Sequence, residues 1–247
     1  MIIKKHIPNF ITLLNLSMGV GSIYLSNEGS PEYLVIAGYF IFLAAVFDFF
    51  DGFAARLLHA KSDIGLQLDS LADMVSFGVA PGFILYRMLL MNPESSVLSL
   101  GSFEIFPVIA ILIPWGAALR LAKFNIDETQ QMGFKGMPTP ALAFFIASLP
   151  IIRQSLISDQ GMLYSIFTNI YLLALTAVGG FFLMTGSFPM FALKFSNYGW
   201  KGNEFRYSFL LISLALILLL KVVAIPIIIV LYILMSFLVV MMKKNNV

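Results

Sequence analysis

The chain has 247 residues, of which 60% are hydrophobic and 11% are charged, and its formal net charge is +2. Its mean hydropathy of +0.92 lies far above the range of soluble proteins, so the composition excludes an ordinary soluble domain and indicates an integral membrane protein. The absence of cysteine from the sequence excludes disulfides, thiolate metal ligands and cysteine nucleophiles.

The apolar residues come in runs of about 20, the length that a helix needs to cross a hydrocarbon core about 30 Å thick. These runs lack the period-two alternation of a membrane β-barrel. The sequence therefore predicts an all-α integral membrane protein, residues 1–247 forming a single membrane domain with about eight transmembrane helices. The expected spans are 8–27, 33–56, 68–91, 104–123, 139–157, 167–185, 207–221 and 224–242.

The basic residues predict how these helices are oriented. Cytoplasmic loops carry an excess of lysine and arginine. If the N-terminus is cytoplasmic, all of the 15 lysines and arginines except Arg87, Arg153 and Lys221 fall on the cytoplasmic side. We therefore expect both termini, and the connection between the second and third spans, on the cytoplasmic side of the cytoplasmic membrane.

The stretch DFFDGFAARLLHAKSDIGLQLDSLAD, residues 48–73, places charges between two predicted spans. Asp48 and Asp51 are three residues apart and Asp69 and Asp73 are four apart, so each pair lies on one face of a helix. Carboxylates at membrane depth repel one another and lose hydration, and a divalent cation would compensate both costs. Ligation by oxygen alone favours Mg²⁺, Mn²⁺ or Ca²⁺ over zinc or copper, and four acids could hold two ions.

The neighbours of these aspartates favour phosphate chemistry. Gly52 and Gly65 allow a ligand or another backbone to approach closely, and Arg56 offers a donor fork suited to phosphate oxygens. Together with bound cations, these residues predict a site for phosphoryl transfer. Two other interpretations stay open, namely interfacial acids solvated by headgroup water and an ion-conducting pathway.

A longer motif joins these residues. The pattern D-x2-D-G-x2-A-R-x8-G-x3-D-x3-D, from Asp48 to Asp73, resembles without a gap the signature of the CDP-alcohol phosphatidyltransferases. Further stretches are similar to the phosphatidylserine synthase branch of that family: IPNFITLLNLSMG at 7–19, LDSLADMVSFGVAP at 68–81, ALRLAKFN at 118–125 and GMPTPA at 136–141. The resemblance covers residues 7–150 and implies a six-helix catalytic core, approximately 7–185, with two additional C-terminal helices, approximately 207–242.

The resemblance also implies an activity, which is transfer of the phosphatidyl group from CDP-diacylglycerol to the hydroxyl of L-serine, giving phosphatidylserine and CMP. It implies that Asp48, Asp51 and Asp69, with help from Asp73, bind two divalent cations, Mg²⁺ or Mn²⁺, with Ca²⁺ as a possible occupant. It assigns to Asp73 the role of accepting the hydroxyl proton. A homodimer surrounded by membrane lipids, with no nucleic acid partner, completes the expectation.

Contacts are expected with both substrates, CDP-diacylglycerol and serine. The resemblance places CDP-diacylglycerol at Gly52, Arg56, Ser62, Gly65, Pro8, Asn9 and Thr12. Helix capping is an alternative role for Asn9 and Thr12. Serine carries a carboxylate that needs a cation, for which Arg120 is the preferred candidate, with Lys123 and Asn125 behind it. The positive-inside rule alone would also place a basic residue at position 120, as an anchor at the cytoplasmic membrane surface. Lys123 departs from the family pattern, because relatives often have arginine at this position.

Other functions remain compatible with parts of this pattern. A divalent-cation transporter would also use intramembrane acids, but it would not need Arg56, and the half-to-half repeat of many transporters is absent from the sequence. A relative that uses glycerol 3-phosphate or inositol phosphate would need extra cations, which Arg120, Lys123 and Lys135 could supply. The segment 187–207 mixes aromatic and basic residues and is interpreted as lying in the cytoplasmic membrane interface.

Overall fold

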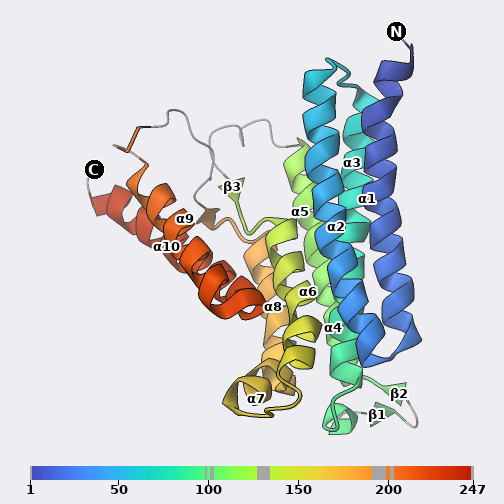
Figure 1. Ribbon diagram of the computed structural model, residues 1–247, viewed down its shortest axis with the longest axis vertical. Helices are drawn as coiled ribbons and strands as arrows, with labels where there is room; N and C mark the ends of the chain where they lie inside the picture. The colour runs from blue at the N-terminus through green and yellow to red at the C-terminus, as the bar shows by residue number, and fades with distance from the viewer. Residues whose placement is uncertain are drawn as a thin grey trace.

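The structure, a computed structural model, describes residues 2–97, 99–100, 103–126, 134–190, 199–200 and 203–245. Most of these residues belong to long helices that run side by side in a bundle (Figure 1). The helices are α1 Ile2–Glu28, α2 Pro31–Leu57, α3 Asp63–Met74, α4 Ala80–Leu90, α5 Leu112–Ile126, α6 Thr139–Ser155, α7 Met162–Thr168, α8 Ile170–Thr185, α9 Glu204–Leu220 and α10 Ala224–Asn245.

Short elements connect these helices. A π-helical turn, Val75–Val79, joins α3 to α4 in one continuous rod, and 3-10 turns cover Ser95–Val97, Phe106–Ile111 and Lys221–Val223. In the described part of the chain the strands are two residues each: β1 Ser99–Leu100 pairs antiparallel with β2 Phe103–Glu104, and β3 Phe134–Lys135 with β4 Pro189–Met190. The predicted all-α class is therefore confirmed.

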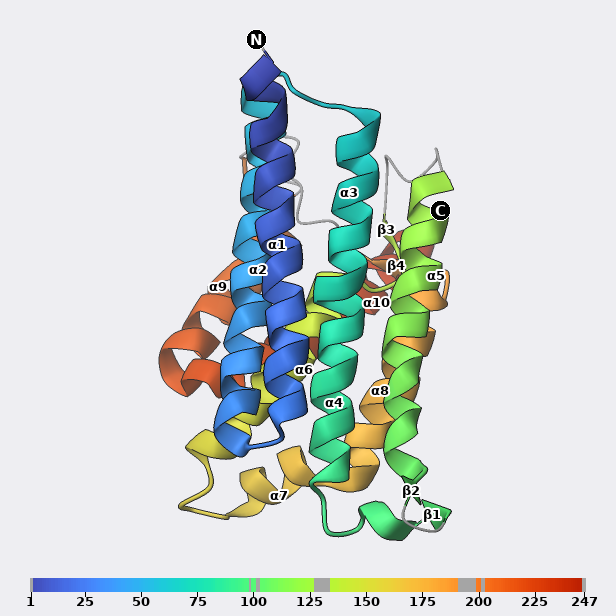
Figure 2. The same ribbon diagram turned by 90° about the vertical axis from the view of Figure 1, so that its right-hand side faces the viewer.

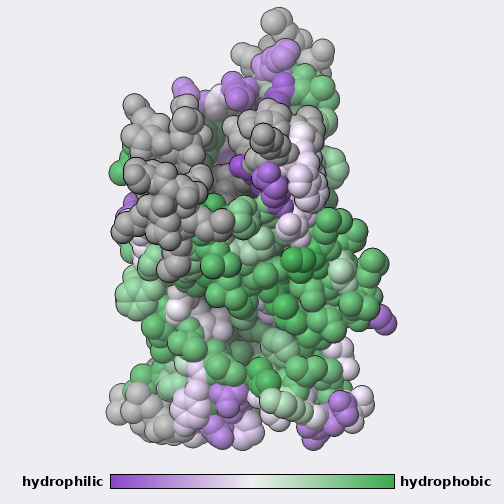
Figure 3. Space-filling view, turned by 90° about the vertical axis from the view of Figure 1, so that its left-hand side faces the viewer, coloured by the Kyte–Doolittle hydropathy of each residue, from purple (hydrophilic) through white to green (hydrophobic). Residues whose placement is uncertain are grey.

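The surface of the bundle fits a membrane. Figure 3 shows an apolar belt across the middle of one face, with hydrophilic residues gathered at both ends. Within the described residues, four helical stretches are long and apolar enough to cross a membrane: 31–57, 63–90, 106–126 and 204–239. The pair α7 and α8, bent by 50° at Asn169, makes a fifth if it counts as one span. The membrane class is confirmed, while the number of eight spans remains a prediction.

Small residues bring the helices close enough to position the site. A Cβ at Gly38 of α2 would collide with the backbone carbonyl of Ala147 in α6, and a Cβ at Gly19 of α1 would lie 2.8 Å from the Cα of Ser76. Close backbone approach of this kind is typical of packed membrane helices. As a result α1, α2 and the α3–α4 rod form one tightly packed group (Figure 2).

The observed boundaries correct three expectations. Because α1 begins at Ile2, Asn9 and Thr12 lie inside the helix, and the capping interpretation of these two residues is wrong. The third helical rod begins at Asp63 instead of residue 68, because the Ser62 hydroxyl caps it by accepting a hydrogen bond from the Gly65 backbone N–H at 3.1 Å. The span expected at 167–185 is interrupted at Asn169. Much of the expected interfacial segment, residues 191–198 and 201–202, lies outside the described residues.

Candidate active site

The carboxylates of Asp48, Asp51 and Asp69 converge between α2 and α3. One oxygen from each of them lies within 4.8 Å of those of the other two. Asp51 is buried and the other two are half-buried. The helix connection that brings them together lies at the same end of the bundle as the N-terminus (Figure 2). The convergence expected from the spacing of the aspartates is therefore present in the fold.

This cluster has the properties of a divalent-cation site. Asp51 Oδ2 and Asp69 Oδ1 are buried, and neither oxygen has a hydrogen-bond partner among the described residues. Buried carboxylate oxygens without donors are strongly unfavourable, and a cation ligated by both would remove this cost. The donor set, which consists of carboxylate oxygens, fits Mg²⁺ or Mn²⁺.

Asp73 lies one helical turn beyond Asp69 and is held by α1. Asn15 Nδ2 donates a hydrogen bond to Asp73 Oδ1 at 3.3 Å, and Asp73 and Asp48 influence each other electrostatically. Asn15 is fully buried, and its Oδ1 has no donor in the described part of the chain. Asn15 was not among the expected site residues, although an asparagine one turn after Thr12 in an apolar span was a usable signal.

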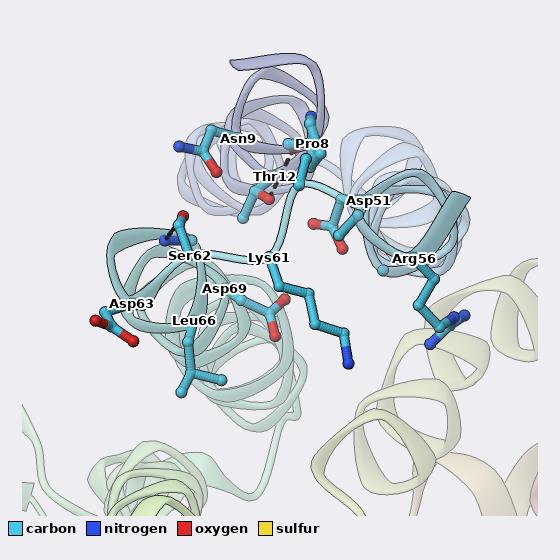
Figure 4. A pocket seen from close by; sticks show the side chains of 14 residues that line it. Pro8, Asn9, Thr12, Asp51, Arg56, Lys61, Ser62, Asp63, Leu66 and Asp69 are labelled. Atoms are coloured by element: carbon cyan, nitrogen blue, oxygen red, sulfur yellow. Dashed lines mark hydrogen bonds between the residues drawn. The ribbon is translucent and has the colours of Figure 1, made fainter. Parts of the chain in front are cut away.

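A cavity of about 490 Å³ opens beside the cluster, between α1 and the α2–α3 connection (Figure 4). The side chains of Asp51 and Asp69 point into this cavity (Figure 4). All residues expected at the CDP-diacylglycerol site line it, namely Pro8, Asn9, Thr12, Gly52, Arg56, Ser62 and Gly65. The fold thus brings residues from three separate segments of the chain to the lining of one cavity.

The two glycines of this cavity differ in their surroundings. A Cβ at Gly52 would meet nothing closer than Arg56 Nη1 at 3.8 Å, whereas one at Gly65 would lie 3.1 Å from both Asn9 Oδ1 and Ser62 Oγ. Gly52 therefore leaves space in the cavity, and Gly65 allows α3 to approach α1. Lys61, which was not among the expected site residues, lines the same cavity (Figure 4).

The three residues expected to bind serine have different environments. Arg120 of α5 is 8% exposed, its buried Nε has no acceptor among the described residues, and it lies within electrostatic range of Asp73. Lys123 Nζ donates to the Thr185 carbonyl at 3.0 Å, at the end of α8. Asn125 Nδ2 donates to the Ser70 hydroxyl at 3.0 Å. Of the three, Arg120 is the one that is buried and that senses the charge of an aspartate, Asp73.

Facing carboxylates beside a cavity lined by glycine, lysine and arginine are typical of membrane enzymes that act on phosphate esters. Comparison with known families agrees with this class. A family model of the CDP-alcohol phosphatidyltransferases matches residues 5–184, and the chain belongs to that family.

Several relatives carry the name CDP-diacylglycerol–serine O-phosphatidyltransferase. The chain is 38% identical to the Bacillus subtilis protein over 137 residues, covering 55% of this chain and 70% of the relative. It is 34% identical to the Saccharomyces cerevisiae protein over 169 residues, covering 63% of this chain but 57% of the relative. A Helicobacter pylori protein is 28% identical over 228 residues, covering 91% of this chain and 86% of the relative.

Proposed function

We propose that this protein transfers the phosphatidyl group of CDP-diacylglycerol to the hydroxyl of L-serine, giving phosphatidylserine and CMP. One observation carries the proposal: the aspartate cluster lies beside a cavity lined by the seven residues expected to contact CDP-diacylglycerol. The names of the relatives support serine as the acceptor.

Asp48, Asp51 and Asp69, with Asp73, would hold two divalent cations, Mg²⁺ or Mn²⁺, with Ca²⁺ as a possible occupant. The orphaned oxygens of Asp51 and Asp69 support this ligand set. When bound, such ions neutralise charge on the pyrophosphate and on the departing CMP. The protein's own side chains would bind and orient the substrates and transfer the proton.

The cavity would receive the cytidine diphosphate. Because Gly52 has no side chain, phosphate oxygens can approach the α2 backbone, and Arg56 and Lys61 supply cations for them. Asn9 and Ser62 offer polar groups to the rest of the nucleotide. The binding is thus electrostatic at the phosphates and directional at the base and sugar.

Asp73 is placed to accept the proton of the serine hydroxyl. Asn15 holds Asp73 Oδ1 by hydrogen bonding, so the geometry of the carboxyl is fixed before the acceptor arrives. The hydroxyl oxygen then forms a bond to the phosphorus that carries the diacylglycerol, the bond from this phosphorus to CMP breaks, and Asp73 keeps the proton. Arg120 binds the carboxylate of serine during this step.

We infer a cytoplasmic location for the cavity and for both termini from the distribution of basic residues. The α2–α3 connection, with Arg56 and Lys61, lies at the same end of the bundle as the N-terminus, in agreement with this orientation (Figure 2). The family resemblance further supports a homodimer in the cytoplasmic membrane.

The acceptor assay tests this function. Purified protein in detergent receives CDP-diacylglycerol, Mg²⁺ or Mn²⁺, and either L-serine, glycerol 3-phosphate or inositol phosphate, and CMP release is measured. We expect release with serine. Arg120→Ala should raise the serine KM roughly 10- to 150-fold, because a charge-assisted hydrogen bond contributes about 1.5 to 3 kcal/mol, while the KM of CDP-diacylglycerol stays unchanged.

Lys123→Ala is the matched control, since its ammonium is engaged with the end of α8. Arg120→Lys should recover part of the serine affinity, because a point charge replaces a planar fork. CMP release with glycerol 3-phosphate but not with serine would refute serine as the acceptor. An absence of CMP release with every acceptor, together with uptake of divalent cations into vesicles, would favour the transporter.

A further inference from the structure

The end of the bundle opposite the aspartates has a polar cavity of its own. This cavity has a volume of about 210 Å³ and lies where the end of α4 meets α6, α7 and the start of α8. Figure 1 shows α7 at this end of the bundle, away from the N-terminus. The cavity shares no lining residue with the one beside the aspartates, so any ligand that it holds is distinct from the substrates bound there.

Arg153 of α6 supplies the positive charge of this cavity. No acidic residue lines the cavity, and within the described ranges no ion pair joins Arg153 to an aspartate or glutamate. Its Nη1 donates to Met91 Sδ at 3.9 Å, which places the guanidinium beside another lining residue. A thioether sulfur is a weak acceptor, whereas a guanidinium has five N–H donors. Arg153 therefore keeps its charge and most of its donors for a ligand.

Hydrogen bonds fix the walls around Arg153. Asn92 Nδ2 donates to the Thr168 carbonyl at 2.8 Å, and Asn92 Oδ1 accepts from the Glu94 backbone N–H at 3.0 Å. The Thr168 hydroxyl donates to the Tyr164 carbonyl at 2.8 Å. The segment after α4 is thus tied to α7, and the polar groups of Asn92 and Thr168 are already engaged. Arg153 and the hydroxyl of Tyr164 remain to bind a ligand.

The position of α7 indicates that the cavity lies at the depth of lipid headgroups. This helix is bent by 50° from α8, and its apolar residues Met162 and Leu163 are 81% and 50% exposed. Exposed apolar side chains on a short helix at the polar end of a membrane protein are typical of the membrane interface. Met88 and Leu173 add apolar walls to the cavity. A ligand with an anionic group beside an apolar part would fit these surroundings.

Two simpler explanations of Arg153 account for less. A cation in the last turn of α6 favours the helix dipole, but this effect needs no cavity around the side chain. The positive-inside rule does not explain it either, because the orientation inferred above places Arg153 on the outer side. A ligand that carries negative charge explains both the position of the arginine and the space beside it.

We propose that Arg153 binds a phosphate group in this cavity, either in the headgroup of a membrane phospholipid or as free inorganic phosphate. Phosphate oxygens match the planar fork of a guanidinium, and Tyr164 lines the same space with a hydroxyl donor. The volume of about 210 Å³ is several times the roughly 30 Å³ of one water molecule in the liquid, so a phosphate group has room. The bound group would link α6 to α7 and stabilise this end of the bundle.

Thermal-midpoint titrations test this site. Purified protein in detergent receives phosphatidylglycerol, diacylglycerol with the same acyl chains, or inorganic phosphate. We expect phosphatidylglycerol to raise the midpoint and diacylglycerol, which lacks the phosphate, to leave it unchanged. In Arg153→Gln the apparent Kd of phosphatidylglycerol should rise roughly 10- to 150-fold, the change for loss of a charge-assisted hydrogen bond.

Two further variants make the titration specific. Lys221→Gln removes one positive charge from the exposed turn between α9 and α10, outside this cavity, and should titrate like the wild type. Arg153→Lys keeps a cation in the last turn of α6, so the helix retains that contribution to its stability. Its apparent Kd should lie between those of the wild type and Arg153→Gln, because a point charge replaces a planar fork.

The phosphate arm identifies the source of the ligand. A rise in midpoint with inorganic phosphate that Arg153→Gln abolishes would assign the site to free phosphate, whereas a response to phosphatidylglycerol alone would assign it to a lipid headgroup. Equal titrations of the wild type, Arg153→Lys and Arg153→Gln would overturn the proposal. An equal rise with diacylglycerol and phosphatidylglycerol would overturn it as well, because acyl chains alone would then account for binding.

Discussion

At the scale of single residues, the contact between Asn15 and Asp73 distinguishes Asp73 from the other aspartates. Asp51 and Asp69 each keep a buried oxygen without a donor, whereas Asp73 Oδ1 accepts a hydrogen bond from a fully buried amide. An amide that occupies one oxygen orients the carboxyl and leaves its second oxygen to receive a proton. This difference supports the proposed roles of Asp73 as general base and of Asp51 and Asp69 as cation ligands.

The change Asp73→Asn separates these roles. We expect the variant to retain binding of CDP-diacylglycerol in the presence of Mg²⁺ while kcat falls by about 10²- to 10⁴-fold, the usual contribution of a general base. Equilibrium binding of the nucleotide-lipid and the rate of CMP release are the measurements, with Asp48→Asn as the comparison. A loss of binding as large as that in Asp48→Asn would make Asp73 chiefly a cation ligand.

At the scale of secondary-structure elements, the short connection between α2 and α3 determines where the aspartates meet. His59 has a left-handed backbone with φ of +50°, and the next N–H, that of Ala60, donates to the Ala55 carbonyl at 2.9 Å, which ends α2 sharply. Ser62 then caps the start of α3. Because this connection is short, α3 runs antiparallel to α2 directly beside it. The carboxylates of α2 therefore face those of α3.

A substitution at Gly52 of α2 should change both the stability of the protein and its affinity for CDP-diacylglycerol. Gly52→Ala should stabilise the fold by about 0.5 to 1 kcal/mol, because alanine favours a helix and its Cβ meets no close atom. It should also raise the KM of CDP-diacylglycerol, because the methyl group occupies cavity space. The thermal midpoint in detergent and the kinetics of CMP release measure the two effects.

Gly179 of α8 provides the control, since a Cβ there would have no atom within 4 Å. Gly179→Ala should stabilise to a similar extent and leave the KM of CDP-diacylglycerol unchanged. An unchanged KM in Gly52→Ala as well would show that phosphate groups do not approach the backbone at this position.

At the scale of the whole molecule, the carboxylate cluster joins α2 to α3, and the proposed cations would link the two helices. Addition of Mg²⁺ or Mn²⁺ to chelated protein should raise the thermal midpoint, since ligand at 100 times its Kd contributes about 2.7 kcal/mol to the native state. Chelation should abolish CMP release, and the metal should restore it.

Asp69→Asn should reduce the metal-induced rise in thermal midpoint because one anionic ligand is lost. Asp63→Asn is the control, because Asp63 also lines the cavity but lies outside the carboxylate cluster. This substitution should reduce the metal-induced rise in thermal midpoint less than Asp69→Asn does. Undiminished turnover after exhaustive chelation would exclude the proposed cation site.

The sequence by itself determined the features that depend on local spacing. Apolar runs of helical length predicted the membrane class, and the three- and four-residue spacings of the aspartates predicted two carboxylate pairs on facing helices. The tight turn at residues 57–63 keeps the pairs within a few helical turns of each other, so a local pattern was sufficient. The motif resemblance likewise predicted residues that the fold gathers around one cavity, from Pro8 to Asp69.

Only the tertiary structure decided which distant side chains complete the site. Asn15 reaches Asp73 through the packing of α1 against α3, and no spacing along the chain encodes a contact between helices that far apart. The π-helical turn Val75–Val79 also depends on contacts between helices. Its Ser76 hydroxyl donates a hydrogen bond to the Asn15 backbone carbonyl at 3.0 Å, which requires α1 to be packed against the α3–α4 rod. Periodicity specifies the faces of single helices, whereas close packing of those faces selects the partners.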